Sequence, residues 1–139
     1  MSFVGHIIIY KDLNMIDQDI ETKPYDLQTQ VFKVLNHPAR LAILEILHDG
    51  EHCVCHMEAY LGFRQSYISQ QLAVLREAGM IQDRRDGWNI FYRVVNQDIY
   101  DVLDAVQKYT GQSVNPSKEQ VVSCNCPHCV SKVNRQKHF

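Results

Sequence analysis

The residues that decide the fold run from Gln65 to Val95 and read QSYISQQLAVLREAGMIQDRRDGWNIFYRVV. In the first half of this stretch, Ile68, Leu72 and Leu75 recur at the spacing of one helical face. The stripe predicts a helix over residues 65–78, with its apolar side turned towards a core and its polar side left for solvent or a partner.

Both ends of this helix carry sequence signals, and a second kind of structure follows it. Ser66 is suited to cap the first turn, and Gly79 is suited to end the last one. Residues 80–85 and 90–95 then alternate or are rich in strand-forming types, and Asp86-Gly87 separates the two runs. An Asp-Gly pair between two such runs predicts a β-hairpin.

Helical patterns also lie on both sides of this stretch. The apolar spacing predicts helices over residues 25–36, 39–48 and 54–61, and a last one over residues 97–109. The last helix has an apolar stripe with no other partner in so small a domain, which indicates a two-fold dimer interface that the helix over 25–36 could share. We therefore expect a mainly α fold with a small β-hairpin wing, the winged helix-turn-helix, in a dimer.

The composition of the 139 residues is that of an ordinary globular chain, with 45% hydrophobic and 22% charged residues. No apolar run approaches the roughly 20 residues of a membrane-spanning helix. We expect a cytoplasmic protein with no membrane partner. Its parts are a poorly specified leader at 1–24, a DNA-binding and dimerisation domain at 25–110, and a cysteine-rich tail at 111–139. Met15 is an alternative start, which would make residues 1–14 spurious or mobile.

The charge is unevenly distributed along the chain. The net charge is −2, but residues 64–93 contain five arginines against three acidic residues. A modest basic face on an acidic chain suits a reversible contact with DNA, because phosphate contacts supply most non-specific affinity.

Three blocks of the sequence resemble the ArsR/SmtB family of metal-sensing repressors. The block LNHPARLAIL at 35–44 is similar to the opening helix signature of the family, SQQLAVLREAGMI at 69–81 to its recognition helix, and the segment 84–93 to its wing. The resemblance covers roughly residues 27–109 in the correct order. It implies a homodimer, not an enzyme, that represses a resistance or efflux operon from double-stranded operator DNA and is released by an inducer.

In a helix-turn-helix, the N-terminal residues of the second helix face base edges in the major groove. The candidate DNA-contacting residues on this helix are Gln65, Ser66, Tyr67, Ser69, Gln70, Gln71 and Arg76. Arg84 and Arg85 flank the hairpin turn and can reach a neighbouring phosphate or the minor groove. We expect Trp88 and Tyr92 to pack on the hairpin rather than to stack on bases.

The cysteines form two clusters, which is the distribution of ligands or redox groups rather than of packing residues. The five are Cys53, Cys55, Cys124, Cys126 and Cys129. The first pair resembles the Cys-x-Cys motif with which arsenic-, cadmium- and lead-responsive members of the family bind soft ions. The zinc site of other members needs a histidine that the last helix here lacks.

Residues i and i+2 inside a helix point about 200° apart, so Cys53 and Cys55 can share an ion only at a helix N-terminus, with Cys53 still extended. There, ion binding would fix or distort the start of the helix that precedes the recognition helix and so separate the dimer from its operator. Further ligands could be His52 or His56, or the tail cysteines. Three thiolates suit arsenite, cadmium or lead, and added histidine favours zinc.

Other functions compete with metal sensing. The thiols could instead form disulfides or persulfides, which would make the chain a redox- or sulfide-responsive repressor of the same fold. The short Cys53–Cys55 spacing argues against an easy disulfide. Cys126-Pro127-His128-Cys129 is also the spacing of thiol–disulfide oxidoreductases, but the α/β context of those enzymes is missing. A metal-storage module would leave the recognition helix and the wing unexplained.

Overall fold

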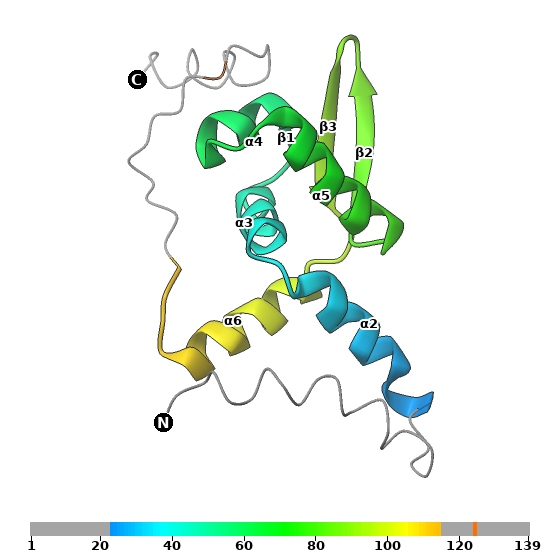
Figure 1. Ribbon diagram of the computed structural model, residues 1–139, viewed down its shortest axis with the longest axis vertical. Helices are drawn as coiled ribbons and strands as arrows, with labels where there is room; N and C mark the ends of the chain where they lie inside the picture. Colours follow the sequence, from blue (N-terminus) through cyan, green and yellow to red (C-terminus); the bar gives the residue numbers. More distant parts are fainter. Residues whose placement is uncertain (1–22, 115–123, 125–139) are drawn as a thin grey trace. The chain divides into compact units, whose positions relative to one another are not determined.

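The structure is a computed structural model that describes residues 23–114 and Cys124 (Figure 1). The chain divides into two compact units, one up to Lys33 and one from Val34 onwards. The first unit contains the 3₁₀-helix η3 (Lys23–Tyr25) and most of helix α2 (Asp26–Leu35). Most of the expected leader and tail therefore lies outside the described residues.

The second unit alternates helices with three short strands. Its elements are α3 (Pro38–Leu47), β1 (His52–Cys53), α4 (Val54–Leu61), α5 (Gln65–Glu77), β2 (Ile81–Asp86), β3 (Asn89–Val94) and α6 (Asp98–Thr110). The strands form one antiparallel sheet in the order β1-β3-β2. Figure 1 shows β2 and β3 as a long hairpin, and β1 pairs with Phe91 and Tyr92 in the middle of β3. This arrangement confirms the predicted winged helix-turn-helix.

The core of this unit is built from the predicted apolar stripes. Ile68, Leu72 and Leu75 of α5 are fully buried and meet apolar residues of α3 and α4 in the core. Helix α3 begins at Pro38. Proline suits this position because a backbone N–H in the first turn would have no acceptor within the helix, so its absence costs no hydrogen bond. Helix α4 ends at Gly62, which adopts the left-handed conformation with φ of 70°.

Two details of the expected elements are corrected. Helix α5 begins at Gln65, so its N-cap is Arg64 and not Ser66. The side chain of Arg64 makes no capping hydrogen bond. The carboxylate of Glu58 accepts a 3.2 Å hydrogen bond from the backbone N–H of Gln65 instead. Sequence patterns also missed β1, because two residues are too few to show a strand period.

The two aromatic residues of the hairpin differ in environment. Tyr92 is 8% exposed and packs in the sheet as predicted, whereas Trp88 is 103% exposed, so the expectation that it packs on the hairpin is wrong. The reason is its position in the turn between β2 and β3, where no neighbouring strand residue covers it. Within the described residues, no helix is long and apolar enough to cross a membrane.

Candidate thiolate site and nucleic-acid interface

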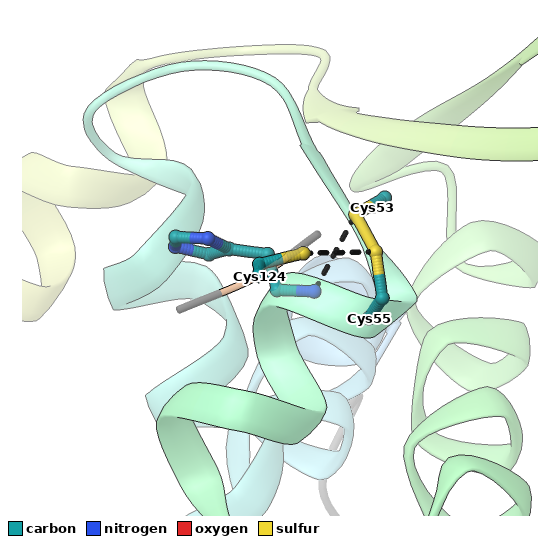
Figure 2. Close-up of a disulfide and its surroundings, with 4 residues drawn as sticks. Cys53, Cys55 and Cys124 are labelled. Carbon is teal, nitrogen blue, oxygen red and sulfur yellow. Dashed lines mark hydrogen bonds between the residues drawn. A yellow bond between two sulfur atoms is a disulfide. The ribbon is translucent and has the colours of Figure 1, made fainter. Parts of the chain in front are cut away.

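Cys53 and Cys55 lie at the junction between the sheet and the helix-turn-helix (Figure 2). Cys53 ends β1 and is also the N-cap of α4, with extended φ and ψ of −87° and 165°. Its sulfur accepts a 3.4 Å hydrogen bond from the backbone N–H of His56. Cys55 lies in the first turn of α4. The extended conformation of Cys53 therefore lets two sulfurs converge that a continuous helix would hold apart.

The two sulfurs are joined in a disulfide, which Figure 2 shows as the bond between Cys53 and Cys55. Their Cα atoms are 5.4 Å apart. This separation is within the usual range for disulfides, so the sequence-based argument that the pair is too close for an easy disulfide is wrong. The extended N-cap provides the separation that a helical turn would not.

Cys124 brings a third sulfur to the pair from a distant part of the chain. Its thiol donates a 3.2 Å hydrogen bond to the sulfur of Cys55, and the three sulfurs lie within 4.8 Å of one another (Figure 2). Two sulfurs that each lie about 2.3 Å from one zinc-sized ion in tetrahedral geometry are about 3.8 Å apart, a separation that small side-chain rotations reach from these positions. The three cysteines therefore fit a shared soft ion once the disulfide is reduced. Phe91 of β3 packs in the same buried cluster.

The remaining candidate ligands are placed differently. The rings of His52 and His56 stack on each other with centroids 4.2 Å apart. Neither ring belongs to the three-sulfur group. Cys126 and Cys129 lie outside the described residues, so the group is defined by Cys53, Cys55 and Cys124.

Helix α5 presents a polar face at its N-terminal end. Gln65, Ser66, Ser69 and Gln70 are exposed there, in keeping with a role in contacting bases. Tyr67 is half-buried, and its ring meets Phe63 edge-on with centroids 5.2 Å apart.

Gln71 does not belong to this face. It is 8% exposed, and its side-chain oxygen accepts a 3.0 Å hydrogen bond from Arg40 of α3. The prediction that Gln71 contacts DNA is therefore wrong. The sequence contained the signal, because Gln71 is three residues after Ile68 and four before Leu75, within the buried stripe.

The two arginines of the wing, Arg84 and Arg85, differ in how far other residues of the protein bind them. Arg84 forms a two-pronged ion pair with Glu51, immediately before β1, and lies 3.6 Å from Asp86. Its guanidinium also lies over the ring of Phe91, 5.1 Å from the centroid. Arg85 is exposed and forms no ion pair with any residue that the structure describes.

Arg76, at the C-terminal end of α5, is also engaged within the protein. It pairs weakly with Asp83 of β2 at 3.8 Å. Both side chains are largely exposed. Arg76 is therefore open to solvent, at the opposite end of α5 from the exposed polar residues of its N-terminus.

The structure has the parts of a winged helix-turn-helix DNA-binding domain. These are the two helices α4 and α5, joined at Gly62, the polar face of α5, and a hairpin that carries arginines. Residues 37–83 match the family described as bacterial regulatory protein, arsR family. The chain is also 40% identical over 91 residues to the HTH-type transcriptional regulator Rv0081 of Mycobacterium tuberculosis, covering 64% of this chain and 80% of that protein. The chain belongs to the arsR family and is a transcriptional repressor rather than an enzyme.

Other relatives show the range of the family. The biofilm growth-associated repressor of Xylella fastidiosa is 34% identical over 93 residues, which cover 67% of this chain and 81% of that protein. The arsenical resistance operon repressor of Escherichia coli is 42% identical over 69 residues, 49% of this chain and 59% of that repressor. The homodimeric winged helix-turn-helix domain Mb0332 of Mycobacterium bovis superposes with a TM-score of 0.58 at 27% identity, covering 68% and 90% of the two chains.

Proposed function

We propose that the chain binds operator DNA as a homodimer in the cytoplasm and releases it when a thiophilic ion binds Cys53, Cys55 and Cys124. The observation that carries the proposal is the convergence of three sulfurs at the N-terminus of α4. Three thiolates suit arsenite, cadmium or lead, whereas an added histidine would favour zinc. The arsenical resistance operon repressor among the relatives supports the same class of inducer.

The first route from the thiolates to DNA runs through the helix-turn-helix. Cys55 lies in the first turn of α4, and Glu58 one turn later holds the N-terminus of α5 through the N–H of Gln65. A shift of α4 therefore moves the end of α5 that faces base edges. Opposite shifts in two protomers change the separation of the recognition helices, so that the operator no longer fits both.

The second route runs through the wing. Cys53 pairs with Phe91 in the sheet, and Glu51, two residues earlier, holds Arg84 of β2. A movement of β1 on ion binding thus reaches β3 by the strand pairing and β2 by the ion pair. Both DNA-contacting elements are connected to one thiolate site.

Dimerisation is supported by apolar side chains left exposed in each unit. Leu27 and Phe32 of α2 are exposed in the first unit, and Val102 and Val106 of α6 are exposed in the second. Apolar patches of this kind mark protein interfaces. The homodimeric Mb0332 domain supports the same assembly. Two recognition helices then read half-sites one helical turn apart.

The disulfide between Cys53 and Cys55 favours one alternative, a redox-responsive repressor of the same fold. In that case two thiols lose two protons and two electrons to an oxidant such as a peroxide, and the new bond displaces α4. The same bond would prevent ion binding, because thiolates rather than a disulfide are metal ligands.

A fluorescence-anisotropy titration of the protein with its own upstream DNA tests the proposal. It is run anaerobically with reductant, with and without arsenite, cadmium, lead, zinc or copper(I), for wild type and for Cys53→Ser/Cys55→Ser. We expect one soft ion to weaken DNA binding about 5–150-fold, the range of ordinary allosteric coupling, and the double variant to lose this response.

The controls separate the two functions. Tight DNA binding that no ion relieves would contradict ion sensing. Release by a peroxide without any ion, reversed by a reductant, would establish the redox alternative instead.

A further inference from the structure

The tip of the wing carries a large apolar side chain that nothing in the described chain covers. Asp86 pairs with Asn89, so the hairpin closes through the two residues Gly87 and Trp88, with Gly87 at φ of 60°. Among the described residues, Trp88 is the most exposed large apolar side chain, at 103%. An indole buries roughly 150–250 Å² when it is packed, so full exposure at this position leaves a large apolar surface in water.

The charges beside the tip indicate what kind of partner covers it. Arg84 is held by Glu51, and Arg93 donates a 3.0 Å hydrogen bond to Gln82. Arg85 has no ion-pair partner among the described residues and lies three positions before Trp88. Asp86 at the turn is also exposed, but it lies 3.6 Å from Arg84. The tip therefore offers one exposed cation three positions from one exposed aromatic ring, a combination that suits a phosphate next to sugars and bases.

We propose that Trp88 enters the DNA minor groove beside the half-site read by α5, with Arg85 on the adjacent phosphate. The proposal rests on the DNA-binding role of the winged helix and does not depend on ion sensing. The minor groove is only about 6 Å wide, and a two-residue turn is a narrow element that can reach into it. Apolar side chains placed there open base steps and make the contact depend on how easily the DNA deforms.

This placement makes Trp88 a determinant of sequence preference outside the bases that α5 reads. Guanine carries an amino group in the minor groove, and an A·T pair does not. A ring that enters the groove is hindered by that amino group. The protein should therefore bind more tightly when the base pairs that flank the half-site, where the wing contacts the DNA, are A·T rather than G·C. This preference needs no side-chain hydrogen bond to the edges of those bases.

The experiment uses reduced full-length protein without metal and duplexes of its own upstream DNA narrowed by footprinting. Trp88 is the only tryptophan of the chain, so its intrinsic fluorescence reports on this position alone. We expect DNA to quench the emission and to protect the ring from acrylamide. Trp88→Ala should weaken binding about tenfold, Trp88→Phe should retain most of the affinity, and Val114→Ala, which also removes an exposed apolar side chain, should leave it unchanged.

Replacing the flanking A·T pairs by G·C, and then by inosine·cytosine, shows whether Trp88 contacts the minor or the major groove. Inosine·cytosine has the major-groove pattern of G·C but lacks the minor-groove amino group. Wild type should bind A·T and inosine·cytosine flanks alike and G·C more weakly, and Trp88→Ala should lose this preference. Unchanged emission on DNA binding, G·C and inosine·cytosine binding alike, or emission that changes with protein concentration alone would overturn the proposal.

Discussion

The hydroxyl of Tyr100 donates a 2.7 Å hydrogen bond to the backbone carbonyl of Leu44, 56 positions earlier in the chain. The bond joins α6 to the last turn of α3, where the N–H of His48 donates to Glu45 rather than to Leu44. The ring of Tyr100 also packs against the ring of His48, with centroids 4.2 Å apart and an interplanar angle of 34°. This contact fixes the helix that carries the proposed dimer surface onto the core.

Tyr100→Phe should lower the free energy of unfolding by about 1–3 kcal/mol, because it leaves a buried carbonyl without its donor. Burial raises the pKa of Tyr100 well above its ordinary value of 10.0. The folded state therefore prefers the protonated phenol, so the contribution is complete below pH 10 and is lost as the pH rises above it. Urea unfolding at pH 7 and above pH 10 measures both effects.

The control for this prediction is Tyr109→Phe, which removes a hydroxyl from an exposed tyrosine of the same helix. It should leave the stability at pH 7 unchanged. Equal losses in the two variants would show that the bond to Leu44 contributes nothing specific.

Gln70 and Gln71 are neighbours in α5 with opposite predicted roles. Gln71→Ala should lower the free energy of unfolding by about 1–2 kcal/mol, because the side chain is buried and accepts from Arg40. Gln70→Ala should leave stability unchanged and weaken operator binding by about 1–3 kcal/mol if the side chain reads an adenine. Thermal unfolding and anisotropy on the two variants separate the roles. A large loss of DNA specificity in a stable Gln71→Ala protein would contradict the structure.

The ion pair between Glu51 and Arg84 gives a prediction about salt. Glu51→Gln should release Arg84 to a phosphate, and each added phosphate contact steepens the slope of log affinity against log salt by about 0.9. We expect a slope steeper by about one unit per protomer, measured by anisotropy at several salt concentrations. Glu77→Gln, the matched control, removes the same charge from an exposed position of α5 and should not change the slope. Identical slopes in wild type and Glu51→Gln would mean that Arg84 stays away from DNA.

The sequence was sufficient for features with a local signal. Apolar periodicity located the helices, and the Asp86-Gly87 pair located the hairpin, because both depend on residues a few positions apart. The same periodicity would have assigned Gln71 correctly, since Ile68, Gln71 and Leu75 share one face. Polarity alone does not distinguish an exposed glutamine from a buried one that accepts a hydrogen bond from an arginine.

Features formed by distant residues had no local signal. Glu51 and Arg84 are 33 positions apart, and Cys55 and Cys124 are 69 apart. The sequence left the further ligands open between His52, His56 and the tail cysteines. Which of the tail cysteines does so depends on tertiary packing, here on the apolar cluster with Phe91.

The choice of tail cysteine leads to the last prediction. If Cys124 completes the site, Cys124→Ser should reduce the ultraviolet thiolate absorption of the cadmium-bound protein by one sulfur in three and weaken cadmium binding at least tenfold, which corresponds to about 1.4 kcal/mol. Cys129→Ser removes a thiol from the same tail and is the matched control. It should leave both quantities, and the release of DNA by cadmium, as in wild type. If Cys129→Ser lost the release of DNA by cadmium and Cys124→Ser kept it, the third ligand would be Cys129 and not Cys124. An undiminished response in both would mean that Cys53 and Cys55 sense the ion without the tail.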